Sequence, residues 1–403
     1  MTNIKTKVIF YAYSNNALDH LAPYVILCHQ KNMHCVVIYG EDFIIHKVKP
    51  KNNIVKIFEE QNIDTYDISH FEMKGLIQII FSYLWIFTKN IEINSFIPNF
   101  FKKKLKGICN RIYEYLDGSS IGKNLALKLL KDTEKVFVFT DFWSRNKKIQ
   151  NSFLSNIKGK ATIISTGHDV YHFHHKPMSA QDKNFSEDIA LTSNQWEENY
   201  RSHIKQREVF GNLRFSKNWL NILDKHSSEK FSEISSKKNV LIITHNEKYT
   251  SDWKRMFKLF HKLVKREDIN LRILPHIRGM SNLEPPNEIK KAWDKTTTLD
   301  VSIKKSDIVI FWVSSGFFEA VLRNKKIIYL SFLSTLDEKF IWKKNAPPNI
   351  IVKNETELDK EIDNYSKDKN YDLDNSCFEE LIWPNGDPWS NVSNFLDKLL
   401  KND

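Results

Sequence analysis

Two hydroxyl groups and a glycine stand between an apolar segment and a helical pattern in the second half of this sequence. Ser314 and Ser315 follow Asp307 and the apolar residues 308–313, and Gly316 lets a backbone approach a ligand closely. The first N–H groups of a helix carry a partial positive charge, so such a turn suits an anion, above all a phosphate. The alternative is that both serines only cap the helix. Glu319, one helical turn further on, could accept hydrogen bonds from a ribose or could complement the helix dipole.

Two other apolar segments in the same half also end in polar side chains. His245 and Glu247 follow the first, and His276 and Arg278 follow the second. Because His276 and Arg278 are two positions apart in an extended or turning segment, both can face one ligand. Arginine supplies a fork of donors that matches a phosphate or a carboxylate. A histidine there can give a proton to a departing phosphate oxygen or simply hydrogen-bond it.

Gly167-His168-Asp169 follows a predicted strand in the first half of the chain. We interpret His168 and Asp169 as a base, nucleophile or orienting pair at a strand end, with a structural role for both as the alternative. More histidines follow at positions 172, 174 and 175 and raise the question of a metal ion. Neither HExxH spacing nor a nearby cysteine accompanies them, so we expect no metal and no other cofactor.

These strand ends need an alternating arrangement of strands and helices to position them, and the sequence predicts one. In the first half, strands are expected at 8–13, 34–40, 53–57, 135–140, 161–166 and 188–192, with a helix at 17–31. A polar stretch at 224–239 then resembles an interdomain connection. In the second half, strands are expected at 240–244, 271–275, 308–313 and 326–330, with a helix at 252–266. Continuous apolar runs suit parallel sheets covered on both faces, so we predict an α/β protein with two Rossmann-like doubly wound domains that face a central cleft.

Length and composition agree with two domains and suggest an anionic partner. The chain has 403 residues, which is too long for one ordinary core, and its formal net charge is +11. A nucleotide, an acidic glycan, nucleic acid or a membrane surface would satisfy that charge, and the charge alone does not choose among them. Cys28, Cys35, Cys109 and Cys377 form no CxxC pair and are expected to be reduced thiols in a cytosolic protein.

The sequence also predicts a cytoplasmic location with a contact at a membrane surface. No secretory signal precedes the first predicted strand, and the longest apolar run, 76–87, falls short of the roughly 20 residues that span a bilayer. Residues 100–116 form a basic amphipathic stretch with aromatic side chains, which could lie on the inner face of the cytoplasmic membrane. The alternative is an ordinary solvated face on a core helix.

The order of these motifs resembles the GT-B glycosyltransferases of bacterial surface polysaccharide biosynthesis, in the branch with capsule and O-antigen transferases and teichoic-acid glycerophosphotransferases. The motifs that carry this resemblance are Gly167-His168-Asp169, the predicted strand 188–192, Gly211-Asn-Leu-Arg214, Pro275-His276-x-Arg278, residues 300–307, Ser314-Ser315-Gly316 and the tail 383–390. The glycerophosphotransferases typically show Trp-His-Gly and Asp-Tyr-Ser-Ser, whereas here Gly167 precedes His168 and Trp312-Val313 replaces the Asp-Tyr pair. The histidine, proline and two serines also resemble transferases that use CMP-activated acidic sugars.

The resemblance implies an organisation and a reaction. Residues 1–225 would form the acceptor-side domain, 226–385 the donor-binding domain, and 386–403 a helix that packs back on the first domain. The donor would be a CMP-linked ulosonic acid such as Kdo or sialic acid, and the acceptor a glycan or a lipid-linked glycan of the capsule or lipopolysaccharide kind. Asp169, His168 and His276 would be catalytic, with Asp169 as the candidate nucleophile by position. The donor-binding residues would be His245, Glu247, Arg278, Ser314, Ser315, Gly316 and Glu319.

Three other functions remain open on the sequence alone. A CDP-glycerol-type polyol-phosphate transferase shares part of the motif pattern. A sugar-nucleotide epimerase shares the two-domain architecture and would need no acceptor. A non-catalytic polyanion-binding protein would explain the positive charge but not the polar residues at four strand ends. The strand ends favour a nucleotide-sugar donor over a nucleic acid partner.

Overall fold

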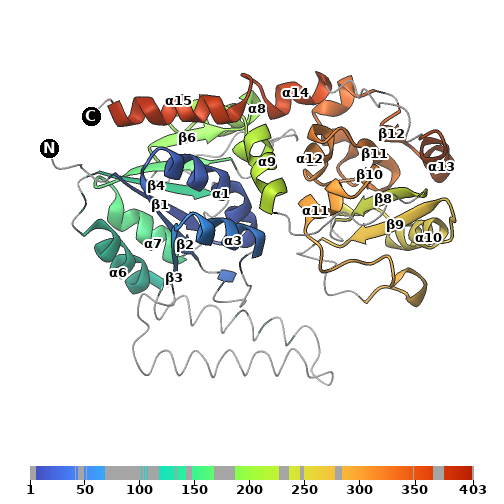
Figure 1. Cartoon of the computed structure of the whole chain (residues 1–403), viewed down its shortest axis with the longest axis horizontal. Helices are drawn as coiled ribbons and strands as arrows, with labels where there is room; N and C mark the ends of the chain where they lie inside the picture. Colours follow the sequence, from blue (N-terminus) through green and yellow to red (C-terminus); the bar gives the residue numbers. More distant parts are fainter. Residues whose placement is uncertain are drawn as a thin grey trace.

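Each half of the chain forms a parallel β-sheet flanked by helices in the computed structural model (Figure 1). The structure describes residues 6–40, 42–43, 50, 52–68, 101, 104, 107, 118–131, 133, 135–141, 148–167, 187–226, 236–245, 249–276, 284–347, 349–365 and 376–401. Two sheets with their own helices and cores confirm the predicted α/β class with two Rossmann-like domains.

The first sheet has seven strands in the order β3-β2-β1-β4-β5-β6-β7, and every pairing between neighbours is parallel. Its interior strands are almost entirely buried, which their continuous apolar sequences require. The strands are β1 (Lys7–Ala12), β2 (His34–Tyr39), β3 (Asp64–Asp67), β4 (Val136–Asp141), β5 (Thr162–Thr166), β6 (Ile189–Thr192) and β7 (Gln206–Val209). The helices are α1 (Asn15–Gln30), α3 (Asn52–Glu60), α6 (Gly118–Leu130), α7 (Lys148–Ile157), α8 (Gln195–Tyr200) and α9 (Lys217–His226), with a short 3-10 turn, η4 (Leu213–Phe215), before α9.

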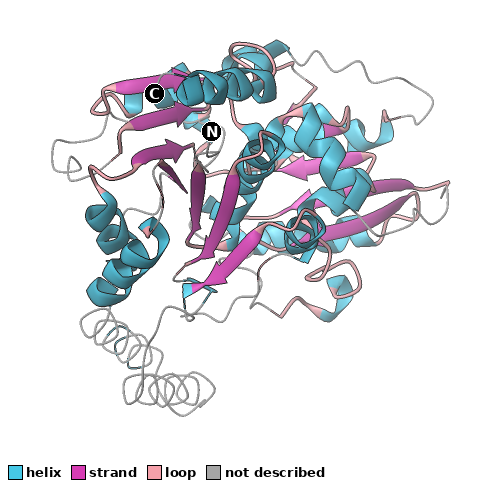
Figure 2. Ribbon diagram, turned by 60° about the vertical axis from the view of Figure 1, so that its left-hand side comes forward, coloured by secondary structure: helices cyan, strands magenta, loops and turns pink. Residues whose placement is uncertain are grey.

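The second sheet has five strands in the order β12-β11-β10-β8-β9, again all parallel. The strands are β8 (Lys238–Ile243), β9 (Ile269–Leu274), β10 (Ile308–Phe311), β11 (Lys326–Leu330) and β12 (Ile351–Val352). The helices are α10 (Trp253–Val264), α11 (Leu299–Lys304), α12 (Phe317–Leu322), α13 (Glu355–Asp363), α14 (Ser376–Ile382) and α15 (Pro388–Lys401). Figure 2 shows the strands of each sheet running side by side with helices packed against them.

The end of the chain crosses from one core to the other. Helix α14 places Phe378 in the core of the second sheet, whereas α15 places Val392 and Phe395 in the core of the first. Figure 1 shows α15 lying along the first domain. In the opposite direction, Phe215 belongs to the second core although it directly precedes α9, which packs on the first. Two separate segments therefore join the domains.

Polar contacts reinforce this junction. The indole N–H of Trp383 donates to the backbone oxygen of Phe215 at 3.0 Å, and the Asn385 amide donates to Val209 at 2.7 Å. On the other side, Arg323 of α12 donates to Asp224 of α9 at 2.9 Å. The bonds of Asn385 to β7 and of Arg323 to α9 therefore tie the second domain to the first.

One predicted strand is wrong, and three strands were not predicted. Residues 53–57 were expected to form a strand but lie in helix α3. Ile54, Ile57 and Phe58 are all buried there, and their spacing of three and four is the helical period. The unpredicted strands are β3, β7 and β12, and each lies at the edge of its sheet. Edge strands have fewer buried positions, so they lack the continuous apolar run that marks an interior strand.

Other expectations lie partly outside the described residues. Of the predicted membrane-contact segment 100–116, the structure describes Phe101, Lys104 and Gly107, and the Phe101 side chain is exposed. Within the described part of the chain, no helix has the length and apolar character needed to cross a bilayer. Cys28 and Cys35 are buried free thiols, and burial raises the pKa of Cys35 to about 12.

Candidate active site

Three neighbouring strands of the second sheet end beside one another and bring predicted site residues together. Ile243 of β8 is level with Phe311 of β10 on one side and with Leu274 of β9 on the other. His245 and His276 therefore leave the same carboxyl edge of the sheet, and Ser314 leaves it from the third strand. The chain runs from β8 to β9 on one side and then crosses to β10 on the other. In parallel α/β sheets, ligands bind at such a switch point.

The two histidines stack on each other. The ring centroids of His245 and His276 are 4.3 Å apart at an interplanar angle of 27°. Tyr249 stands edge-on to His245 with centroids 4.8 Å apart. The Thr244 hydroxyl fixes the arrangement, because it accepts from the backbone N–H of His276 at 2.9 Å and donates to the backbone oxygen of Leu274 at 3.1 Å. Both imidazoles are half-buried, so a ligand can reach them.

The segment that carries Tyr249 is held from two directions. The indole N–H of Trp312, which is fully buried at the end of β10, donates to the Thr250 hydroxyl at 3.1 Å. The Ser251 hydroxyl donates to the backbone oxygen of Phe332 at 2.9 Å. Trp312 is thus an anchor inside the fold.

The serine turn differs in part from the sequence prediction. The N–H groups of Phe317, Phe318 and Glu319 bond to backbone oxygens of residues 314–316, and the N–H of Gly316 donates to the Ser314 hydroxyl at 3.3 Å. The prediction that free N–H groups of this helix face a phosphate is therefore wrong, because the turn itself uses them. Ser314 and Ser315 are half-buried, so their hydroxyl groups remain within reach of a ligand.

The glycine of this turn is explained by packing. A Cβ atom built on Gly316 would lie 2.7 Å from Cδ2 of Leu299, a side chain of α11. Its φ of −56° is one that any residue adopts. Close contact between α11 and the turn is therefore a sufficient reason for glycine, without a ligand against the backbone.

Glu319 is buried and makes an ion pair inside the fold. Its carboxylate accepts from Nε of Arg323 at 3.1 Å, and Arg323 also binds Asp224. Burial raises the pKa of Glu319, while the charge of Arg323 acts in the opposite direction. This placement favours the structural role for Glu319 over a contact with a ribose.

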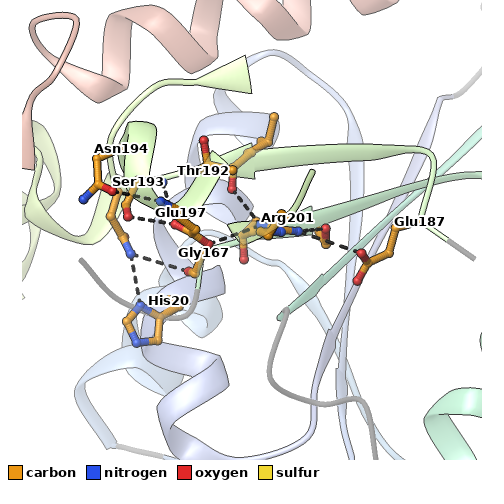
Figure 3. Close-up of polar contacts among 12 residues, drawn as sticks. His20, Gly167, Glu187, Thr192, Ser193, Asn194, Glu197 and Arg201 are labelled. Carbon is orange, nitrogen blue, oxygen red and sulfur yellow. Dashed lines mark hydrogen bonds and ion pairs between the residues drawn. The ribbon is translucent and has the colours of Figure 1, made fainter. Parts of the chain in front are cut away.

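A buried polar network lies at the corresponding edge of the first sheet (Figure 3). Glu197 of α8 directs its carboxylate at Gly167, the residue after β5, and Arg201 lies behind it. The Asn212 amide donates to the backbone oxygen of Gly167 and to Nδ1 of His20, both at 3.5 Å. Sequence reasoning found Gly167 but missed the other members.

A signal for this network was present in the sequence. Asn194 and Glu197 have the spacing of a capping box, and Glu197 and Arg201 have the i,i+4 spacing of a helical ion pair. Both patterns are common on helix surfaces, so burial is what distinguishes this instance. Arg201 is fully buried and Glu197 is 3% exposed.

Four predicted site residues lie outside the described residues: His168, Asp169, Glu247 and Arg278. The structure describes their neighbours Gly167, His245 and His276, which occupy the carboxyl edges of the two sheets. Among the residues it describes, no three His, Cys, Asp or Glu side chains are grouped so that they could bind a metal ion.

Comparison with known proteins places the fold in a class. No family model matches the chain, and no curated protein matches it in sequence. Solved structures with the same arrangement of two Rossmann-like domains do match along nearly its whole length. The chain thus has the two-domain fold of GT-B enzymes.

Three individual structures illustrate this likeness. MnaA of S. aureus, in a structure with UDP, has 14% identity and a TM-score of 0.52, with 98% of this chain and 96% of that one covered. A UDP-N-acetylglucosamine 2-epimerase has 13% identity and a TM-score of 0.53, with coverages of 99% and 96%. The wall teichoic acid polymerase TagF, in a structure with CDPG, has 13% identity and a TM-score of 0.53, with coverages of 99% and 90%. At such identities the likeness concerns the fold.

Proposed function

We propose that this protein is a glycosyltransferase that moves a sugar from a nucleotide-activated donor to a growing surface glycan. The observation that carries the proposal is the stacked pair His245 and His276, which lies at the switch point of the second sheet next to Ser314. Donor groups from three strand ends converge on a place where α/β sheets bind ligands. The fold shared with MnaA and TagF, whose structures contain UDP and CDPG, supports a nucleotide sugar as the ligand.

The chemistry of transfer fits these side chains. Negative charge develops on the phosphate as the sugar leaves, and donors fixed in advance stabilise it. His276, whose backbone is fixed by Thr244, would donate to the departing phosphate, with His245 stacked beside it. The hydroxyls of Ser314 and Ser315 would hold the phosphate from the other side of the switch point. Such donors can neutralise a phosphate without a metal ion, and we propose none.

The remaining predicted residues complete the proposal from their positions in the sequence. Arg278 and Glu247 follow the two histidines at a distance of two residues each, and we assign them to the donor site. His168 and Asp169 follow Gly167 and would act on the sugar carbon or on the acceptor hydroxyl. The acceptor would be a glycan or a lipid-linked glycan.

The proposed donor is a CMP-linked ulosonic acid such as Kdo or sialic acid, because of the histidine, proline and serine pattern around His276 and Ser314. Thermal-shift measurements with CMP, CDP, UDP and GDP test this donor, since a bound nucleotide stabilises the folded state by mass action. We expect a shift with CMP or CDP. A shift with UDP alone would overturn the cytidine donor, and no shift with any nucleotide would overturn the transferase.

Variants locate the site. A hydrogen bond to a charged group contributes about 1.5–3 kcal/mol, so His276→Ala and the double variant Ser314→Ala/Ser315→Ala should each weaken nucleotide affinity by about 10- to 100-fold. The controls are His261→Ala on α10 and Ser155→Ala on α7, which lie on helices away from the strand ends. Undiminished affinity in both site variants would refute the assignment of the phosphate site.

A sugar-nucleotide epimerase is the second candidate. The likeness to a UDP-N-acetylglucosamine 2-epimerase over 99% of this chain favours it. An epimerase converts its substrate without an acceptor, whereas the proposed transferase needs one. Rapid interconversion of a nucleotide sugar in acceptor-free buffer, followed by chromatography of the products, would replace the transferase with the epimerase.

We further propose a cytoplasmic protein that contacts the inner face of the membrane through residues 100–116. The exposed side chain of Phe101 and the exposed Lys104 support this placement. Co-sedimentation with vesicles that contain anionic lipid tests it. We expect binding that Phe101→Ser weakens and that neutral vesicles do not give; equal binding to both kinds of vesicle would contradict it.

A further inference from the structure

The space next to Gly167 is occupied by a carboxylate. A Cβ atom built on this residue would lie 2.8 Å from Oε2 and 3.1 Å from Oε1 of Glu197. Contacts below 3.0 Å do not occur for real Cβ atoms, so any other residue at position 167 would displace one of the two groups. The glycine is thus required by the position of the carboxylate.

The carboxylate of Glu197 is itself fixed. Its Oε2 accepts from the backbone N–H and from the hydroxyl of Ser193, both at 2.7 Å, and its Oε1 accepts from Nη1 of Arg201 at 3.3 Å. The backbone N–H of Glu197 donates to the Asn194 side chain at 3.1 Å, so Asn194 caps helix α8 while the Glu197 carboxylate bonds the preceding residue, Ser193. Figure 3 shows these groups converging on the end of β5.

Arg201 connects this carboxylate to two strands. Its guanidinium donates to the hydroxyl of Ser165 on β5 and, at 3.3 Å, to the backbone oxygen of Leu191 on β6. It also lies 3.9 Å from the carboxylate of Glu187, just before β6. The neighbouring strands β5 and β6 are therefore linked through one buried side chain.

The backbone oxygen of Gly167 is bonded to the segment that joins the two domains. The Asn212 amide that donates to the backbone oxygen of Gly167 belongs to the segment that precedes η4. Turn η4 follows it and ends in Phe215, which packs in the core of the second sheet. The backbone at Gly167 thus contacts both the charge pair and the connection between the domains.

Stability alone gives little reason for this arrangement. Burying charges costs desolvation energy, and apolar residues of similar volume are often as stable as a buried ion pair or more so. Burial raises the pKa of Glu197, which is the expected sign of this cost, although Arg201 and Ser193 offset part of it. A buried charge pair at this place gives fixed geometry, because each group has a defined partner.

We propose that Glu197 and Arg201 are positioning residues that hold the backbone at Gly167 in one conformation at the carboxyl edge of the first sheet. They act through the backbone and touch no substrate. This inference rests on the proposed function for its consequence, because His168 directly follows Gly167 in the sequence. Turnover would then depend on Glu197, whereas nucleotide binding at the second sheet would not.

Hydrogen exchange of backbone amides tests the positioning independently of any activity. Gly167→Ala and Glu197→Asp should each raise the exchange rate in the peptide around residues 162–167 by at least about 10-fold, with exchange at 269–274 unchanged. In the double variant Gly167→Ala/Glu197→Asp, the shorter acid leaves room for the added methyl group, so exchange should fall back below that of Gly167→Ala. The matched control is Glu198→Asp, since Glu198 pairs with Arg207 on the other side of the helix. Additive effects in the double variant, or wild-type exchange in Gly167→Ala, would overturn the proposal.

Kinetics supply the second readout. With the nucleotide sugar that the wild type turns over, Glu197→Asp should lower kcat by at least about 10-fold and leave KM for the donor and the nucleotide-induced thermal shift unchanged. A general loss of folded protein would also lower the apparent kcat without changing KM, so kcat is expressed per folded molecule, with the folded fraction taken from the amplitude of the thermal unfolding transition. Unchanged kcat in a variant with altered exchange would refute the positioning role. If the wild type turns over no nucleotide sugar, the proposed function fails and the exchange measurements alone decide the inference.

Discussion

The two domains carry the same Glu–Arg pair at the same place. Helices α8 and α12 each have six residues and follow a strand end. In each, the glutamate is the third residue, and the arginine four positions later is the C-cap residue: Glu197 and Arg201 in the first domain, Glu319 and Arg323 in the second. The two pairs differ in what the arginine reaches next.

In the first domain the pair acts within the sheet. Arg201 binds Ser165 and Leu191 on neighbouring strands. In the second domain the pair contacts the other domain, because Arg323 binds Asp224 of α9, a helix that packs on the first core. One local pattern therefore fixes a strand end in one domain and joins the two domains in the other. What each pair does depends on the group that the arginine binds besides its glutamate. That group lies outside the helix in both domains.

Removing each arginine should separate these two uses. Arg201→Ala leaves Glu197 buried without its cation, which typically costs about 3–5 kcal/mol, so the free energy of unfolding in urea should fall by that amount. Arg323→Ala also removes a cation from a buried glutamate, Glu319, but should cost less, about 1.5–3 kcal/mol, because the Arg323 side chain is 10% exposed and the charge of Arg214 also acts on Glu319. It should also split denaturation into two transitions as the domains uncouple. Arg207→Ala, a half-exposed control, should cost at most about 1 kcal/mol. Equal losses for Arg201 and Arg323, with one transition each, would abolish the distinction.

A pH series should show what the two pairs have in common. Burial raises the pKa of Glu197 and of Glu319 above the ordinary glutamate value of 4.5. As the pH rises from about 4.5, the unfolded chain loses these protons first, so the folded state loses stability by at most about 1.4 kcal/mol per pH unit and proton. Glu197→Gln and Glu319→Gln remove this slope. As the pH rises, the Tm of the wild type should therefore fall relative to the Tm of each variant. Parallel Tm curves for wild type and variant would argue against a raised pKa.

The smallest expected effect concerns the carboxyl edge of the second sheet. Trp312→Phe keeps an aromatic side chain but loses part of the ring area and the hydrogen bond to Thr250. The lost hydrogen bond should lower the free energy of unfolding by about 1 kcal/mol more than the loss of ring area alone. Because Thr250 adjoins Tyr249, the variant should also reduce the nucleotide-induced thermal shift. Trp293→Phe, at another buried indole of the second core, is the control for loss of ring area. A loss of stability with a full nucleotide shift would show that the Tyr249 segment does not shape the site.

The sequence was most informative about the interiors of the sheets. Strands such as β1 and β10 are continuous apolar runs and were predicted within a few residues. The polar strand β3 was missed because an edge strand needs no such run, and Ile54 and Ile57 were assigned to a strand although their spacing is helical. The local sequence pattern therefore predicts the interior strands of a sheet. Whether a polar segment forms an edge strand depends on its pairing with a neighbouring strand, which the local pattern does not show.

The site could be predicted in part for a similar reason. His245 and His276 were found because polar residues after apolar runs lie at strand ends. Their stacking depends on β8 and β9 being neighbours, which no local pattern gives. The partners of Gly167 were missed because a Glu–Arg pair at helical spacing is usually solvent-exposed. Burial arises from the packing of distant segments, so it could not be seen in a window of the sequence.

The crossing of α15 has a consequence for the order in which the chain folds during synthesis. The first domain is translated early, but Trp389, Val392, Phe395 and Leu396 of α15 belong to its core. Until the ribosome has released these residues, the apolar face of the first domain that α15 covers stays exposed, and exposed apolar surface favours aggregation of the growing chain. A premature stop just before α15 would thus harm the domain made first, while the domain next to the break would lose little of its own core.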